Sequence, residues 1–327
     1  MKKRQIGTSL LRTWLLGTQE RMGALPKTLL YVLLIAIGFV YIYPLLNMLI
    51  TSLESLDDLL DPAVQWLPHK LRLDNYGKAF QTMGVAEHLV DTLELTLLPA
   101  LMQTISCALA GYAFARFNFK GKRLLLLFVL LTFIVPFPVL MMPTYSLYSK
   151  YNILGSIWTI VFPAMTGQGL RAAIFILIYR AFYAQTPRAL DEAARVDGAS
   201  EKRVFFTIGL PLGLPAMLTS FLFSFVWYWN DTYMNNLYVA GVKRVGDARQ
   251  ISTLMMELVR FEDSYSAYLK KQYGSAAAAA ATGAANVQNE AVTMAGTMLA
   301  IAVPLLLYFL LQKYFVNAID RSGITGE

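Results

Sequence analysis

The stretch TPRALDEAARVDGASEKRVFFTIGLPLGLP, residues 186–215, combines charged residues, small residues and prolines, although the runs on either side are strongly apolar. Thr186 followed by Pro187 predicts the start of a short helix, because threonine is a good N-cap and proline suits the first helical position. Gly198 predicts the end of that helix, since glycine easily adopts the left-handed conformation found there. Ser200 predicts the cap of a second helix. The stretch is therefore predicted to be a helix, a turn and a helix.

The composition of the whole chain indicates an integral membrane protein. Of its 327 residues, 56% are hydrophobic and 15% are charged, and the mean hydropathy is +0.48. Soluble domains have about 45–50% apolar and about 25% charged residues. The single cysteine, Cys107, lies in an apolar run, so we expect a small buried side chain and neither a disulfide nor a thiolate metal site within this chain.

Six apolar runs approach or exceed the length of about 20 residues that a helix needs to cross a bilayer. Pro136 and Pro138 predict a kink in the third run, and TGQGLR, residues 166–171, interrupts the fourth. The predicted fold class is an all-α membrane protein with six transmembrane helices. Their expected ranges are 28–50, 95–115, 124–142, 153–182, 208–229 and 291–311.

Basic residues in the connections predict the orientation, because they concentrate on the cytoplasmic side. Residues 1–27 hold six lysines and arginines, and the turn RFNFKGKR at 116–123 holds four. The connection 51–87 holds six acidic and three basic residues, as an external loop can. Six crossings would then place both termini and the stretch 186–215 in the cytoplasm. This topology also accounts for the net charge of +7, so we do not expect nucleic acid as a partner.

The motif EAARVDGAS followed by IGLPLGLP resembles the EAA motif of the membrane subunits of binding-protein-dependent ABC importers. The phrases ITSLESLDD with LDNYGKAF, QTPRALDEAARVDGAS, WYWN and LLQKYFVNAI resemble recurring segments of the carbohydrate branch, the maltose-type permeases, and especially its oligo- and polysaccharide group. The resemblance extends over most of the chain from about Tyr43. It implies a type I ABC importer permease fold with a basic cytoplasmic segment at 1–27, a six-helix permease domain at 28–315 and a cytoplasmic tail at 316–327.

In that family the EAA motif forms a coupling helix that lies in a groove of a cytoplasmic ATPase. Carried over to this chain, the expected docking residues are Glu192, Ala193, Ala194 and Gly198, with Asp197 beside them. The small side chains of the two alanines agree with close docking. A solvated, well-capped connection is the simpler interpretation of the same residues.

The resemblance also implies a set of partners. They are a second permease subunit, two ATPase subunits, an extracytoplasmic solute-binding protein, a saccharide substrate and membrane lipid, in the inner membrane of a bacterium. The chain has no G-x-x-x-x-G-K-[ST] phosphate loop. ATP and Mg²⁺ are therefore expected on the partner ATPase, and this chain is expected to be non-catalytic and to bind no cofactor.

Polar residues near the fourth and fifth runs are candidates for a substrate route. Polar groups at membrane depth face a cavity or a protein partner, and broken helices line the routes of many transporters. Gln168 and Arg171 are therefore candidates, and Arg171 would favour an acidic saccharide. Alternatively, residues 153–165 form a separate outer helix and Arg171 meets water or a carboxylate. Trp229 and Asn230 belong either to an interfacial aromatic belt or, with stacking on sugar rings, to the route.

The segment 232–290 is predicted to be external. Leu254, Leu258, Phe261 and Tyr265 fall on one helical stripe, and GSAAAAAATGAANVQ, residues 274–288, is a low-complexity linker. In maltose-type relatives a loop at this place reaches toward the solute-binding protein, whereas a plain spacer is the alternative.

Two other classes of membrane protein are alternatives. An intramembrane enzyme finds little support, because the two histidines, His69 and His88, both lie in the first external connection, and neither HExxH nor G-x-S-x-G occurs. A secondary transporter would be expected to show an internal repeat or paired broken helices in both halves. The sequence shows one break.

Overall fold

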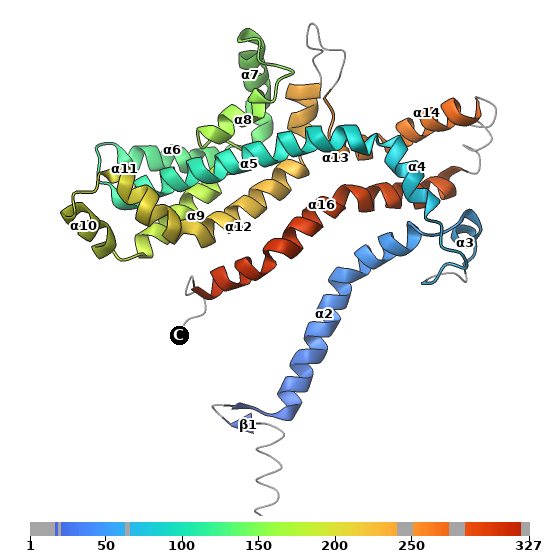
Figure 1. Ribbon diagram of the computed structural model, residues 1–327, viewed down its shortest axis with the longest axis horizontal. Coiled ribbons are helices and arrows are strands. Elements are labelled where there is room, and N and C mark those ends of the chain that lie inside the picture. The colour runs from blue at the N-terminus through green and yellow to red at the C-terminus, as the bar shows by residue number, and fades with distance from the viewer. Residues whose placement is uncertain (1–16, 19–20, 63–65, 241–250, 275–284, 322–327) are drawn as a thin grey trace, which may run out of the picture. The chain divides into compact units, whose positions relative to one another are not determined.

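The structure is a computed structural model that describes residues 17–18, 21–62, 66–240, 251–274 and 285–321. It divides into two compact units, residues 1–76 with 283–298, and residues 77–282 with 299–327. The described chain is helical apart from a ladder of two-residue strands, β1 (Gly17–Thr18) and β2 (Arg21–Met22) (Figure 1).

The first unit contains a long apolar helix and a short capped one. Helix α2 (Ala24–Thr51) has a mean hydropathy of 2.4 in its most apolar window, and none of that window is buried. Helix α3 (Leu56–Leu60) begins at Ser55, whose hydroxyl accepts a hydrogen bond from the Asp58 amide while the Asp58 carboxylate accepts from the Ser55 amide. The Asn75 side chain donates to the Ser52 and Glu54 carbonyls and holds the connection in place.

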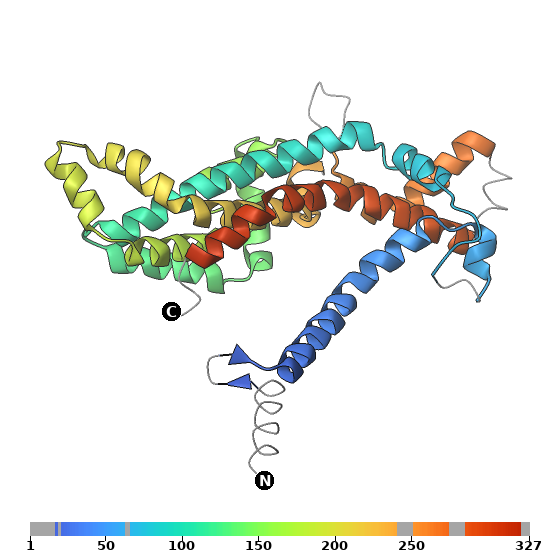
Figure 2. The ribbon, with the colours of Figure 1, turned by 60° about the horizontal axis from the view of Figure 1, so that its bottom comes forward.

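The second unit is built around α5 (Val85–Arg116), which packs against α8 (Trp158–Met165), α9 (Ala172–Gln185) and α12 (Leu210–Trp229) (Figures 1 and 2). Cys107 is fully buried in this core, as predicted. At Gly111 a Cβ would lie 2.3 Å from the Tyr179 Cβ and 2.9 Å from the Arg180 amide nitrogen. The crossing of α5 and α9 therefore depends on the absence of a side chain at that position.

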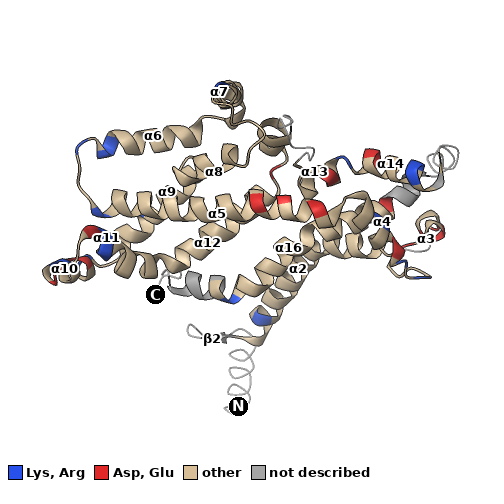
Figure 3. Cartoon of the chain, turned by 45° about the horizontal axis from the view of Figure 1, so that its top comes forward, with Lys and Arg blue, Asp and Glu red and all other residues tan. Residues whose placement is uncertain are grey.

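The remaining elements connect these helices. Charged residues gather at the α10–α11 hairpin and around α13 and α14, whereas the helices between are mostly uncharged (Figure 3). These remaining elements, in chain order, are α4 (Asp74–Thr82), α6 (Lys122–Ile134), α7 (Phe137–Lys150), α10 (Ala189–Val196), α11 (Glu201–Val204), the π-helix η1 (Phe205–Gly209), the π-helix η2 (Asn235–Ala240), α13 (Leu254–Val259), α14 (Phe261–Tyr273) and α16 (Ala285–Arg321).

The structure supports a multi-span helical protein with fewer clear crossings than the six predicted. Within the described residues, four helical segments are long and apolar enough to cross a membrane: 24–51, 85–116, 201–229 and 290–314. The pair α6 and α7 would make a fifth, but it bends by 103°.

The third and fourth predicted crossings are broken more severely than expected. Pro136 is the N-cap of α7 and Pro138 lies in its first turn, so the chain breaks where the prolines predicted a kink. The fourth run divides into α8, of eight residues, and α9, of 14, neither of which spans a bilayer alone.

The caps predicted within 186–215 are confirmed at two of three positions. Gly198 has a φ of +81°, and the Ser200 hydroxyl accepts a hydrogen bond from the Arg203 amide. The prediction for Thr186 was wrong: Thr186 caps the end of α9, and α10 begins after Arg188. The Thr186 hydroxyl donates to the Tyr183 carbonyl and accepts from Arg116, so it is already bonded to other groups.

The helical stripe predicted for Leu254, Leu258, Phe261 and Tyr265 is confirmed. Leu254, Phe261 and Tyr265 are buried and Leu258 is partly buried, although the helix divides at Arg260 into α13 and α14. The stripe is anchored to α5, where the Leu254 amide donates to the Thr92 hydroxyl at 2.9 Å and the Ser252 amide to the Asp91 carboxylate at 3.4 Å. Most of the alanine-rich linker, residues 275–284, lies outside the described residues.

Candidate functional site

The outer face of α10 carries the residues that match the EAA motif. Glu192, Ala193, Asp197 and Gly198 are exposed, and Ala194 is partly exposed. The structure thus gathers all five predicted docking residues on one short helix and its C-terminal cap. Because Ala193 and Ala194 have small side chains and Gly198 has none, the backbone of another protein can approach this surface closely.

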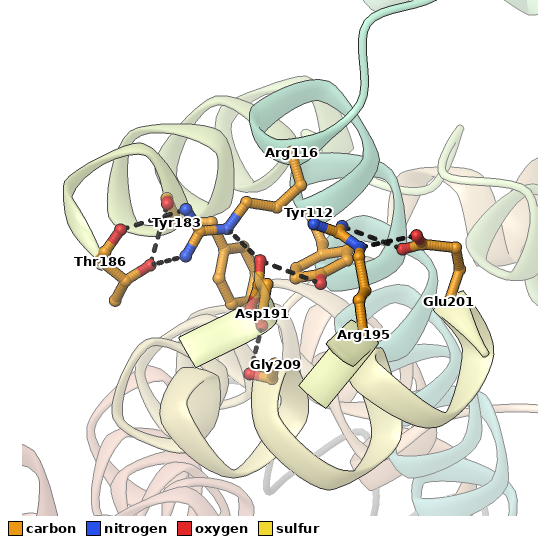
Figure 4. Close-up of polar contacts among 8 residues, drawn as sticks. All are labelled: Tyr112, Arg116, Tyr183, Thr186, Asp191, Arg195, Glu201 and Gly209. Atoms are coloured by element: carbon orange, nitrogen blue, oxygen red, sulfur yellow. Dashed lines mark hydrogen bonds and ion pairs between the residues drawn. The ribbon is translucent and has the colours of Figure 1, made fainter. Parts of the chain in front are cut away.

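The end of α10 is fixed by its own hydrogen bonds. The Gly198 amide donates to the Arg195 carbonyl at 3.0 Å and the Ala199 amide to the Ala194 carbonyl at 2.9 Å, which is the Schellman pattern that a left-handed residue permits. Arg195 then donates through Nε and Nη2 to the two carboxylate oxygens of Glu201 on α11, at 2.8 and 3.1 Å (Figure 4). This hydrogen-bonded pair raises the pKa of Arg195 above its usual value.

The buried side of α10 is bound to α5 by an ion pair. Asp191 is 2% exposed, and its Oδ2 lies 2.9 Å from Nε of Arg116, the last residue of α5. Arg116 also donates to the Thr186 carbonyl and hydroxyl, at 3.1 and 2.8 Å, and the Tyr112 hydroxyl donates to Asp191 at 3.4 Å (Figure 4). Helix α10 is therefore fixed at Asp191, while the motif residues around it stay wholly or partly exposed.

Sequence reasoning missed Asp191 and its partners. Asp191 directly precedes the EAA motif, where an acidic residue resembles part of a solvated face, and Arg116 in the sequence indicates only the membrane side of its turn. The useful signal was their position: an arginine at the end of a crossing and an acidic residue in a hairpin predicted on the same membrane side.

The interruption of the fourth run is an ordered turn held by two neighbouring helices. Gln103 on α5 is fully buried, and its Nε2 donates to the Leu170 carbonyl at 2.9 Å and to the Ser224 hydroxyl at 3.1 Å. The Tyr228 hydroxyl on α12 donates to Gln103 Oε1 at 2.6 Å and accepts from the Leu170 amide at 3.0 Å. Both polar groups of the Leu170 backbone thus have hydrogen-bond partners inside the protein, which an unwound segment would need at membrane depth.

Gly169 makes this turn sterically possible. A Cβ at Gly169 would lie 2.2 Å from Gln103 Oε1 and 2.4 Å from the Tyr228 hydroxyl. Any larger residue would therefore displace the side chains that satisfy the turn.

The two polar candidates in the turn lie at its surface. Gln168 and Arg171 are both exposed in this chain. Arg171 is the N-cap of α9 with a φ of +54°, and its guanidinium carbon lies 4.7 Å from the centroid of the Trp227 ring, within the range of a cation–π interaction. Residues 158–165 before the turn form a separate helix, α8, which is part of the range 153–165 that the alternative interpretation gave to such a helix.

The two candidates at the end of α12 have different surroundings. Trp229 is 1% exposed, and its indole nitrogen donates to the Ala300 carbonyl at 3.0 Å. This burial corrects the expectation of a ring free for lipid or sugar: Trp229 packs inside the unit. Asn230 caps α12 and is exposed. Among the described residues, no three His, Cys, Asp or Glu side chains are arranged to hold a metal ion.

The family described as binding-protein-dependent transport system inner membrane component matches residues 107–321, which is more than half of the chain. The matched range contains the α10–α11 hairpin and the turn 166–171. The chain belongs to this family. It is therefore a membrane subunit of a binding-protein-dependent importer and not an enzyme, as the EAA motif predicted.

Relatives of nearly the same length agree with this family. The chain is 28% identical over 315 residues to the osmoprotective compounds uptake permease protein GgtD of Synechocystis sp., covering 94% of this chain and 95% of the relative. It is 26% identical over 293 residues to the arabinooligosaccharides transport system permease protein AraQ of Halalkalibacterium halodurans, covering 89% and 93%.

A third relative and a solved structure extend the comparison. The polygalacturonan/rhamnogalacturonan transport system permease protein YtcP of Bacillus subtilis is 23% identical over 300 residues, covering 91% of this chain and 97% of the relative. The fold is similar to a chain in the crystal structure of a bacterial ABC transporter involved in the import of the acidic polysaccharide alginate. The TM-score is 0.65 at 20% identity, with 88% of this chain and 96% of that chain covered.

Proposed function

We propose that this permease forms half of the transmembrane route of an importer for oligo- or polysaccharides, and that the exposed face of α10 docks on a cytoplasmic ATPase. The supporting observation is the two-sided character of α10: Asp191 is fixed to α5, whereas residues 192–194 and 197–198 are available to a partner. The full assembly would contain a second permease subunit, two ATPase subunits that bind ATP and Mg²⁺, and an extracytoplasmic solute-binding protein.

The proposed topology has six crossings, with both termini in the cytoplasm of a bacterial cell and the permease in its inner membrane. The pair α6–α7 and the broken pair α8–α9 would supply the third and fourth. Two contacts support this topology. The Arg116–Asp191 pair joins the basic turn after α5 to the hairpin, and the Thr92–Leu254 hydrogen bond joins the other end of α5 to α13. Helices α10 and α13 therefore lie near opposite ends of α5.

The substrate is proposed to be a saccharide with acidic groups. Two of the relatives described above are named for arabinooligosaccharides and polygalacturonan/rhamnogalacturonan. In this chain Gln168 and Arg171 project from the ordered turn, and exposed Asn230 lies one helical turn beyond Trp227. We propose that these three residues line the route, with Arg171 contacting carboxylates.

Copurification from native membranes tests the assignment to an importer. A tag on this permease is expected to recover an ATPase, a second permease and, in the presence of a saccharide-loaded binding protein, ATP hydrolysis above the basal rate. Uptake driven by an ion gradient in vesicles that lack the ATPase would contradict the proposal.

The variant Arg171→Gln tests whether Arg171 contacts the carboxylates of an acidic saccharide. Uptake of an oligogalacturonate is expected to fall at least roughly tenfold, because a hydrogen bond to a charged group contributes about 1.5–3 kcal/mol, while uptake of a neutral arabino-oligosaccharide changes little. Lys313→Gln is a matched control, since Lys313 is also an exposed cation over an aromatic ring, that of Tyr314. Unchanged uptake of both sugars in Arg171→Gln would remove the role of Arg171.

A further inference from the structure

Helices α5 and α9 are joined at three successive points along their length. Near the start of α9, Gln103 binds the Leu170 carbonyl. In the middle, Gly111 lies against Tyr179 so closely that a Cβ would meet the Tyr179 Cβ at 2.3 Å. Just beyond the end of α9, Arg116 binds both the carbonyl and the hydroxyl of Thr186. The order of these contacts shows that the two helices run in the same direction.

The joined segment is an uninterrupted, close-packed part of the two helices. Residues 103–116 contain no proline, and at 1.5 Å per residue they extend about 20 Å. The side chains between them and α9 are almost fully buried, including Cys107, Tyr112 and Tyr179. Close-packed interiors of this kind transmit displacement rather than absorbing it.

The α10 helix is attached to this rigid pair through Asp191. A buried ion pair adds little net stability, because removing both charges from water costs about as much as their attraction returns. It does, however, favour one arrangement strongly, since moving Asp191 away would leave Arg116 charged and poorly paired in the interior. The exposed Arg195–Glu201 pair connects α10 to α11 instead.

We propose that Arg116 and Asp191 are positioning residues that transmit movement of α10 through the α5–α9 pair to the turn 166–171. Displacement of the hairpin moves the C-terminal end of α5, and Gln103 carries the movement to Leu170 and so to the exposed residues of the turn. This inference rests on the proposed docking of an ATPase at α10.

A labelling experiment on the whole assembly tests this link. Gln168→Cys in a Cys107→Ala background supplies a single reporter thiol in the turn, and its reaction with a membrane-impermeant maleimide is measured with and without ATP and vanadate. Complexes are purified through a tag on the ATPase, so that only assembled particles are measured. With Arg116 and Asp191 intact, the labelling rate is expected to change at least about fivefold, the lower limit of usual coupling between sites.

The decisive variant replaces both charges, Arg116→Met with Asp191→Leu. Apolar replacement of a buried pair is commonly neutral for stability, so the assembly is expected to form and to hydrolyse ATP while the nucleotide-dependent change in labelling disappears. The control, Arg195→Met with Glu201→Leu, removes the exposed pair on the same hairpin and is expected to keep that change.

Three other outcomes would contradict either this inference or the proposed docking. An undiminished labelling change in the double variant overturns the inference. Failure of that variant to assemble overturns it as well, since the pair would then serve assembly rather than transmission. Absence of the permease with the natural pair from the material recovered through the ATPase tag would instead contradict the proposed docking.

Discussion

The variant Gly111→Ala is expected to destabilise the permease by about 3 kcal/mol or more, at or beyond the upper end of ordinary overpacking. The added methyl group would lie 2.3 Å from the Tyr179 Cβ, and two backbone atoms of α9, the Arg180 amide nitrogen and the Ile176 carbonyl oxygen, lie within 3.0 Å of the same point. Backbone cannot rotate out of the way as a side chain can, so α5 and α9 must separate. The midpoint of thermal aggregation of purified protein in detergent measures the loss.

The same substitution at Gly38 is the matched control. Gly38 lies inside α2, and in the described part of the chain no atom comes within 4 Å of the position that a Cβ would take there. Gly38→Ala should therefore leave the midpoint unchanged or raise it slightly, because alanine favours a helix by up to about 1 kcal/mol over glycine. Equal midpoints for the two variants would show that α5 and α9 can separate at their crossing without cost.

The variant Gly198→Pro is expected to abolish copurification of the ATPase while leaving the permease folded. Proline fixes φ near −65° and lacks an amide hydrogen, whereas Gly198 has a φ of +81° and donates to the Arg195 carbonyl. The cap would open and displace Ala193, Ala194 and Asp197. The bound ATPase, measured by pull-down at fixed permease concentration, should fall at least about tenfold, which corresponds to about 1.4 kcal/mol.

Gly198→Asn distinguishes the backbone conformation from the side chain. Asparagine tolerates the left-handed region better than other non-glycine residues, and among the described atoms none lies within 4 Å of the position a Cβ would take at Gly198. This variant should retain the ATPase. If proline and asparagine behave alike, the Schellman cap is not what positions the docking surface.

Features that depend on neighbouring residues were predictable from the sequence. The caps at Gly198 and Ser200, the break at Pro136 and the interruption at 166–171 are set by backbone preferences that act over a few residues. The EAA motif predicted the family for the same reason, because its residues lie close together in the sequence. The number of membrane crossings was harder to predict from the sequence, because the length of an apolar run does not show how sharply α6 and α7 bend.

Contacts between distant residues were not predictable. Gln103 and Leu170 are 67 positions apart, and Tyr112 and Asp191 are 79 apart, so no periodicity in the sequence connects them. Thr186 shows how such a contact overrides a local rule, because Arg116 takes the hydroxyl that a helix cap would need. Trp229 is a second example, because its indole nitrogen donates a hydrogen bond to a backbone carbonyl of α16, which is distant in the sequence.

The hydrogen bonds around Leu170 determine which amino acid can occupy position 103. The Gln103 side chain accepts through its oxygen and donates twice through its nitrogen, to partners on two different segments. A carboxylate of the same length would face the Leu170 carbonyl with a second acceptor, and leucine or methionine would fill the volume with neither function. Position 103 therefore requires a side chain that offers both a hydrogen-bond acceptor and two donor hydrogens, and a side chain of the right size alone would not be enough.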